Sequence, residues 1–216
     1  MSGAQAPENE AATLLKNARA LIAAARSGAV PVVYVQHCGR AGDEFEEGRE
    51  AMLLEAFSWD SAGPRPTLAE FREHPEFTKL LADWGRPGDR GVVAEEQQTK
   101  TGAAWFRLWT PELHSYGFVN AETPELGIAV AAAHRSKGVG RTLLRALIEI
   151  ARADGHPALS LSVSPSNYAR SFYASEGFHK IGESGTSWTL LLQLARTPRE
   201  GAAQQTTAAD EPLGRW

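Results

Sequence analysis

The sequence predicts an α/β domain with a central mixed sheet flanked by helices, and two observations support this fold class. Residues 124–194 alternate between short apolar runs and helical patterns, in the order ELGIAV, RTLLRALIEIARAD, ALSLSV, NYARSFYASE, GFHKIGE and SWTLLLQL. Residues 91–109 add two more strand-like runs, GVVAEE and TGAAWFRLW, separated by QQTK. Strands that alternate with helices are typical of a sheet with helices packed against it.

The elements before residue 91 are predicted from the same patterns. LLKNARALIAAARSG places apolar residues at helical spacing over residues 11–27, and the β-branched run PVVYVQ at 31–36 reads as a short buried strand. REAMLLEAFSW predicts another helix. TLAEFREH and EFTKLLADWG then predict a helix that is interrupted near Pro75, because proline cannot donate the backbone hydrogen bond a helix interior needs.

These patterns divide the chain into three parts. Residues 1–47 form a helix-strand extension, and residues 48–196 form the main domain. Residues 197–216 read TPREGAAQQTTAADEPLGRW. This segment is polar and low in apolar residues, and it predicts a disordered tail.

Composition excludes several classes of function. With 22 basic and 26 acidic residues the formal net charge is −4, whereas a nucleic-acid-binding protein would need a basic face. No run approaches the roughly 20 apolar residues of a membrane span, and MSGAQAPENE lacks the layout of a signal peptide. Cys38 is the single cysteine, which excludes an internal disulfide. We therefore expect a cytoplasmic protein that binds neither membranes nor nucleic acid.

The most informative segment is the loop between the strand ELGIAV and the helix that follows it. Gly138 and Gly140 lie in this loop, together with the cations Arg135, Lys137 and Arg141. The first backbone N–H groups of a helix have no partner within the helix, the helix dipole is positive there, and glycines allow a ligand to come close to the backbone. The segment therefore predicts a site for an anion, most naturally a diphosphate.

Two common phosphate-binding motifs do not match. A dinucleotide-binding loop needs G-x-G-x-x-G and an acidic residue after the next strand, and a nucleoside-triphosphate loop needs G-x-x-x-x-G-K-[ST]. The pattern present is R-x-x-G-x-G at 135–140, followed downstream by SVSPSNYARSFYASEGFHKIGE. Together these two segments resemble the GCN5-related N-acetyltransferases (GNAT), over about residues 48–194. Ala132 stands where that family usually has proline, and Ser136 where it usually has glycine; we expect Ser136 to need an unstrained φ.

The resemblance implies acetyl-CoA as co-substrate and assigns its binding groups. The pyrophosphate would be held by backbone N–H groups and cationic side chains of Arg135, Ser136, Lys137, Gly138, Val139, Gly140 and Arg141. Backbone groups of Ile128, Ala129 and Val130 would pair with the pantetheine arm as with an added strand, in the gap where ELGIAV and ALSLSV splay apart. Asn167 would hydrogen-bond the same arm from the other side.

Tyr173 and Glu125 are the predicted catalytic residues. By the resemblance, Tyr173 would donate a proton to the departing thiolate, although it could instead be a core aromatic beside Phe172. Glu125 begins a strand and could accept a proton from the attacking amine, or simply be a solvated carboxylate. His114, Tyr116 and His134 are alternative bases. The aromatic side chains expected to line the acceptor pocket, or alternatively to pack in the core, are Trp105, Trp109 and Phe118.

A different resemblance covers the N-terminal extension. Residues 8–47 resemble a fragment of the isochorismatase-like cysteine hydrolases, but Cys38 does not occupy the position of their nucleophile. His37 and Cys38 lack the further ligands of a zinc site, and we expect no metal. The main domain lacks the usual first strand of the family's sheet. We hypothesise that residues 31–36 replace it, the alternative being a loosely attached segment.

The functional prediction is an N-acetyltransferase that moves an acetyl group to a primary amine of a small molecule or peptide. The mechanism implied by the resemblance is direct attack in a ternary complex. A non-catalytic acyl-CoA-binding module and a remnant cysteine hydrolase remain alternatives. A homodimer is left open, and the sequence does not identify the acceptor.

Overall fold

The computed structural model describes residues 32–34, 52–56, 58, 66–96 and 99–194. Its strands form one mixed sheet in the spatial order β1-β2-β3-β4-β5-β7-β6. The strands are β1 (Val32–Tyr34), β2 (Arg90–Glu96), β3 (Thr99–Arg107), β4 (Glu125–Val130), β5 (Ala158–Val163), β6 (His179–Ser184) and β7 (Ser187–Gln193). The helices are α3 (Leu68–Glu73), α4 (Pro75–Leu81), η1 (Ala132–His134), α5 (Val139–Ala153) and α6 (Ala169–Ser175), and residues 52–56 are also helical.

The sequence predicted most of these elements. The two runs at 91–109 form the antiparallel pair β2–β3, and the alternating runs of residues 124–194 give β4, α5, β5, α6, β6 and β7 in the predicted order. The break near Pro75 is confirmed: α3 ends before it, and Pro75 is the first residue of α4, where a missing N–H costs nothing. Thr67 and Glu70 form a capping box that starts α3.

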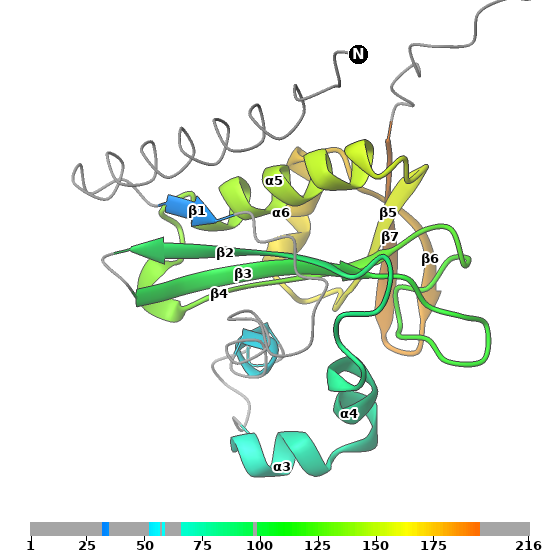
Figure 1. Cartoon of the computed structure of the whole chain (residues 1–216), viewed down its shortest axis with the longest axis horizontal. Coiled ribbons are helices and arrows are strands. Elements are labelled where there is room, and N and C mark those ends of the chain that lie inside the picture. The colour runs from blue at the N-terminus through cyan, green and yellow to red at the C-terminus, as the bar shows by residue number, and fades with distance from the viewer. Residues whose placement is uncertain (1–31, 35–51, 57, 59–65, 97–98, 195–216) are drawn as a thin grey trace, which may run out of the picture.

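Helices cover both faces of the sheet. In Figure 1, α5 and α6 lie on one side, and α3 and α4 lie on the other together with the helical segment 52–56. The face under α5 carries the larger apolar core, in which Leu143, Leu144 and Leu147 of the helix are fully buried. The opposite face carries a smaller cluster around Phe71, Trp84 and other residues of the helical segments.

The strand predicted at 31–36 lies at the edge of the sheet. Val32–Tyr34 pair antiparallel with β2, in the register Val32↔Glu95 to Tyr34↔Val93. This is the position hypothesised for a substitute first strand. The predicted helix 11–27, Cys38 and the tail 197–216 lie outside the described residues. Within the described ranges, no helix is both long and apolar enough to cross a bilayer.

One irregularity of the sheet positions the functional site. β4 and β5 are parallel neighbours, but they pair at a single position, Glu125↔Ser160, where the Ser160 N–H donates to the Pro124 carbonyl at 3.0 Å. Beyond that point the two strands separate. Every other neighbouring pair of strands in the sheet keeps at least three paired positions, so this gap is a local feature of β4 and β5.

Candidate active site

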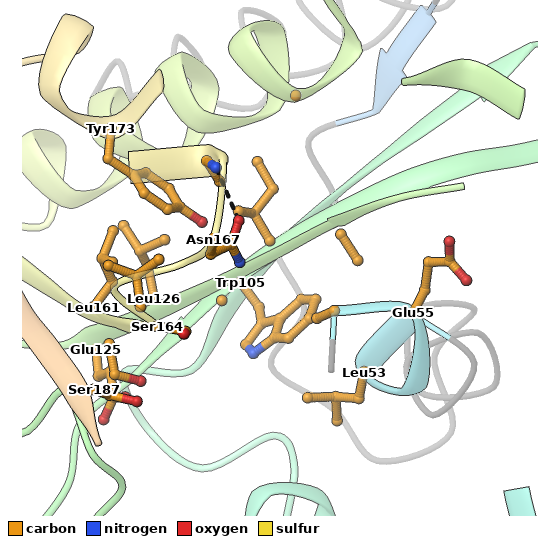
Figure 2. Close-up of a pocket in the computed structure, with 18 of the residues that line it drawn as sticks. Leu53, Glu55, Trp105, Glu125, Leu126, Leu161, Ser164, Asn167, Tyr173 and Ser187 are labelled. Atoms are coloured by element: carbon orange, nitrogen blue, oxygen red, sulfur yellow. Dashed lines mark hydrogen bonds between the residues drawn. The ribbon is translucent and has the colours of Figure 1, made fainter. Parts of the chain in front are cut away.

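The gap between β4 and β5 opens into a cavity of about 1000 Å³. Its walls come from β4, from the loop before α5, from the end of β5 with the start of α6, and from α4 on the far side. Figure 2 shows Tyr173 and Asn167 on one side, Glu125 near the start of β4, and Trp105 between them and Leu53 of the helical segment 52–56. The cavity therefore brings together residues more than 100 positions apart in the sequence.

The free edge of β4 offers backbone groups to this cavity. Ala131 N–H bonds to Thr101 of β3, while the carbonyls of Pro124 and Val130 accept bonds on the β5 side, from Ser160 N–H and from Arg135 Nε. The backbone N–H and C=O groups of successive residues along a strand point to opposite edges. Those of Ile128 and Val130 therefore point toward the cleft, and those of Ala129 point toward β3.

This alternation corrects part of the sequence prediction. Ile128 and Val130 are placed to pair with an extended ligand, but the backbone of Ala129 is directed into the β3–β4 ladder. The Val130 carbonyl is also already bonded to Arg135 at 3.1 Å. The groups open to the cleft are thus the N–H and C=O of Ile128 and the N–H of Val130.

The loop before α5 is the segment that the sequence predicted to bind an anion. Gly138 precedes the helix with φ 86°, a left-handed conformation that glycine adopts without steric cost. In the described part of the chain, no backbone acceptor is found for the N–H groups from Ser136 through Arg141, so this concave surface keeps its donors for a ligand. Ser136 has φ 60°, which is a left-handed conformation, so the expectation of an unstrained φ is wrong. The loop makes a turn at this position that a glycine would adopt without strain.

The cations of this loop are arranged differently from the prediction. Arg135 Nη2 donates to Glu55 at 2.6 Å, and Arg141 Nε donates to Glu176 at 2.7 Å. Both guanidinium groups thus have carboxylate partners within the protein, whereas Lys137 is exposed. Hydrogen bonds from Arg145 and then from Arg141 hold the pKa of Glu176 below its usual value. Among the described residues, the two guanidinium groups therefore have partners, whereas the backbone N–H groups from Ser136 to Arg141 have none.

Asn167 lies at the start of the segment that leads into α6. Its Oδ1 accepts the Ala169 N–H at 2.8 Å, which fixes the side chain, and the residue lines the cavity. The side-chain NH₂ group has no acceptor among the described residues, and its donation to a ligand stays a prediction.

Tyr173 lines the same cavity from α6. It is 8% exposed, and its ring packs against Phe172 and Phe178 at centroid distances of 5.3 and 5.9 Å. The ring is thus part of the core, as one alternative held, and the residue also lines the cavity. Its role as a proton donor stays a prediction. Burial raises the pKa of the phenol above its ordinary value, so the hydroxyl stays protonated and able to donate.

Glu125 is a buried carboxyl group in the cavity wall. Its residue is 8% exposed, Oε1 accepts the Gly117 N–H at 2.8 Å, and Oε2 has no hydrogen-bond partner among the described residues. Burial raises its pKa to about 7, against the smaller lowering effect of the bonds from Gly117 and Ser115. The alternative of a solvated strand-end carboxylate is wrong, because the 110–123 loop covers the start of β4.

The alternative bases are less well placed. His114 stacks on Phe118 and His134 lies 3.3 Å from Glu96; neither histidine is among the residues that line the cavity. Tyr116 does line it, but is 43% exposed.

Of the aromatic residues expected in the acceptor pocket, Trp105 and Trp109 line the cavity and Phe118 does not. Trp105 lies over Gly127, and the indole ring leaves no room for a side chain at that position. A Cβ atom on residue 127 would come within 2.6 Å of the ring. Gly127 was missed by sequence reasoning, as were Leu53, Phe77, Leu80, Trp84 and Ser187, which also line the cavity. Apolar residues on one face of a helix predict that this face is buried. The local sequence does not tell whether such a residue packs in the core or lines a cavity.

No group of three or more potential metal ligands occurs among the residues that the structure describes.

Comparisons with known proteins agree with this geometry. The pattern of the family described as the acetyltransferase (GNAT) family matches residues 52–178. The chain belongs to this acetyltransferase family. The match includes the splayed strands, the anion-binding loop and α6.

Individual relatives are more distant. Mouse N-acetyltransferase family 8 member 3 is 34% identical over 89 residues, which are 41% of this chain and 38% of the mouse protein, so the chain matches well under half of the length of that relative. The PaiA N-acetyltransferase of Thermoplasma acidophilum, solved with coenzyme A, has a TM-score of 0.57 at 20% identity and covers 76% of this chain and 99% of its own. The ribosomal-protein-alanine N-acetyltransferase of Brucella melitensis gives 0.54 at 22%, covering 76% and 99%.

The structural similarities confirm the GNAT fold, and the family match over residues 52–178 assigns the chain to a transferase family. They do not support the resemblance of residues 8–47 to isochorismatase-like hydrolases.

Proposed function

We propose that the protein transfers an acetyl group from acetyl-CoA to a primary amine of a small molecule or peptide, by direct attack within a ternary complex. The observation that carries the proposal is the separation of β4 from β5 after one pair, beside a loop with open backbone donors. Such a site can hold an extended chain along a strand edge and a diphosphate at its end.

Each end of the co-substrate has complementary groups. The N–H groups from Ser136 to Arg141 would hold the pyrophosphate at the positive end of α5. Ile128 and Val130 would pair with the pantetheine arm from β4, and Asn167 would donate from the opposite side. Solved GNAT neighbours include one with coenzyme A bound, which supports the choice of ligand.

The reacting groups lie on the same cavity. Glu125, with a pKa of about 7, would accept the proton that the amine loses when it attacks the thioester carbonyl. An N–H group of the β4 edge, at Ile128 or Val130, would stabilise the developing oxyanion. Tyr173, kept protonated by burial, would donate its proton to the departing thiolate.

The proposal is tested by two measurements on the full chain. Calorimetry with coenzyme A should show binding, and release of free thiol from acetyl-CoA should depend on an added amine. A non-catalytic binding module would give the first result without the second. Absence of any coenzyme A binding to folded protein would refute the proposed function altogether. A cytoplasmic location and a homodimer stay predictions.

A further inference from the structure

One part of the cavity, which we call the acceptor arm, is lined by segments other than the anion-binding loop. This acceptor arm runs between α4, β3, the 110–123 loop and the β6–β7 turn. Its lining residues are His74, Phe77, Leu80, Trp84, Trp105, Arg107, Trp109, Ser115, Tyr116, Gly185, Thr186 and Ser187. Half of them carry aromatic or aliphatic side chains, namely Phe77, Leu80, Trp84, Trp105, Trp109 and Tyr116, and the twelve come from four separate segments.

The α4 wall of the acceptor arm is largely apolar. Phe77 and Leu80 lie three residues apart on α4 and so share one side of the helix, and His74 just before the helix lies at the end of the same row. Phe77 stacks on the fully buried Phe71 at 4.1 Å and contacts the His74 ring at 4.7 Å. This wall is therefore held in place by the smaller core behind it.

The opposite wall is the β3 face with its tryptophans. Trp105, 8% exposed, lies on Gly127, whose missing side chain makes room for the indole. Because Gly127 is two residues beyond Glu125 on β4, the two lie on the same face, and the indole extends the floor of the arm away from the carboxyl group.

The charges of this arm are compensated at all positions except one. Arg107 is buried and forms a two-pronged ion pair with Asp89, through Nε–Oδ1 at 3.1 Å and Nη2–Oδ2 at 2.8 Å. Its remaining N–H groups donate to the carbonyls of Leu80, Ala82 and Asp83. Glu125 Oε2, in contrast, is buried and has no hydrogen-bond partner among the described residues.

Polar groups gather where Glu125 lies. The Gly117 N–H donates to the carboxyl group, the Ser115 side chain lies near enough to lower its pKa, and Figure 2 shows Ser187 at the same end of the pocket. The arm therefore has one polar end, which can receive an amine, and an aromatic and aliphatic body, which offers few partners to other polar groups.

We propose that the acceptor is a primary amine attached to an uncharged aliphatic or aromatic skeleton. The inference rests on the proposed function and specifies its second substrate. The nitrogen lies at Glu125, and the skeleton packs against Trp105, Phe77 and Leu80. A second charge or several hydroxyl groups on the acceptor lose their hydration against these walls without gaining hydrogen bonds, which disfavours their binding.

The test is a series of linear amines from propylamine to hexylamine, with 6-aminohexanoate as the charged match of hexylamine. Each methylene buried in the arm is expected to raise kcat/KM about fourfold. The terminal carboxylate of 6-aminohexanoate is expected to lower kcat/KM about 100-fold or more relative to hexylamine, because a charge is buried unpaired. An aminoglycoside serves as the polyhydroxylated comparison.

One substitution in the α4 wall and two control substitutions locate the effect. Leu80→Gln places an amide in the partly exposed α4 wall and is expected to reduce the ratio of kcat/KM for hexylamine over propylamine about tenfold. Phe77→Leu, which keeps the wall apolar, should change that ratio less than threefold and guards against a simple folding defect. Leu113→Gln alters an exposed leucine outside the cavity and should leave the ratio unchanged.

Each outcome separates this inference from the proposed function. Equal kcat/KM values along the amine series, or efficient acetylation of 6-aminohexanoate or the aminoglycoside, would overturn the apolar acceptor while leaving acetyl transfer intact. If coenzyme A binds but no amine is acetylated, the proposed acetyl transfer is rejected. Calorimetry that compares the binding of hexylamine and 6-aminohexanoate then tests whether the acceptor arm prefers an uncharged skeleton. Equal or absent binding of both would reject it.

Discussion

Replacing Glu125 with glutamine tests whether this buried carboxyl group is both destabilising when ionised and responsible for accepting a proton. The substitution keeps the shape of the side chain and the acceptor for Gly117 N–H, but it removes the titration. In the folded protein the pKa of Glu125 is raised from its ordinary value of 4.5 to about 7, chiefly by burial.

The magnitude follows from linkage between protonation and folding. The folded state binds the proton more tightly than the unfolded chain, so the contribution of Glu125 to stability is complete below pH 4.5 and is lost as the pH rises through 7. At 1.36 kcal/mol per pH unit, the rise from 4.5 to about 7 corresponds to about 3 kcal/mol. The wild type should therefore lose about 3 kcal/mol relative to Glu125→Gln between pH 4.5 and pH 8.

The assay is urea unfolding of both proteins at several pH values, with the difference in unfolding free energy plotted against pH. Comparison with the variant cancels the titration of all other groups. Glu112→Gln, which changes an exposed carboxylate of the neighbouring loop, should run parallel to the wild type. A constant difference between wild type and Glu125→Gln across the pH range would refute the reasoning.

The pH dependence of activity provides an independent test of the role of Glu125. A general base must be deprotonated, so kcat/KM of the wild type should rise with pH through about 7. The Glu125→Gln variant should lose about 10²–10⁴-fold in kcat and lack this rise. Unchanged activity in the variant would show that another group accepts the proton.

Three further predictions concern other parts of the site. Tyr173→Phe should lower kcat about 100-fold with little change in the KM for acetyl-CoA, because only the proton donor is removed; steady-state kinetics measure this, and a change in KM alone would point to a packing role. Ser136→Gly should raise the unfolding free energy by about 1 kcal/mol by relieving the left-handed φ, whereas Ser166→Gly should not; denaturant unfolding compares them. Arg107→Met should cost about 3–5 kcal/mol, since it leaves Asp89 buried without its partner, and adding Asp89→Asn should recover part of the loss; equal stability of wild type and Arg107→Met would contradict the buried pair.

Local patterns predicted the elements well, because strand and helix periodicities are written in consecutive residues. The order from β4 to β7, the break at Pro75 and the anion-binding loop before α5 all followed from such patterns. The loop was predictable because glycines and the start of a helix create open N–H groups wherever they occur together.

Side-chain contacts within the site were less predictable. The cationic residues Arg135 and Arg141 suggested phosphate contacts, yet Glu55 and Glu176, distant in sequence, hold their guanidinium groups. The strained φ of Ser136 likewise depends on the turn that the whole loop makes, and the sequence could only point to the replaced glycine.

The sequence by itself predicted a GNAT domain, a loop suited to a diphosphate, and Tyr173 and Glu125 as candidates for proton transfer. Only the tertiary structure showed that Glu125 is buried, which raises its pKa to about 7, and that α4 and Trp105 line the cavity beside it. A pKa and the chemistry of a cavity depend on which distant segments remove water from a group, and that information is carried by packing rather than by neighbouring residues.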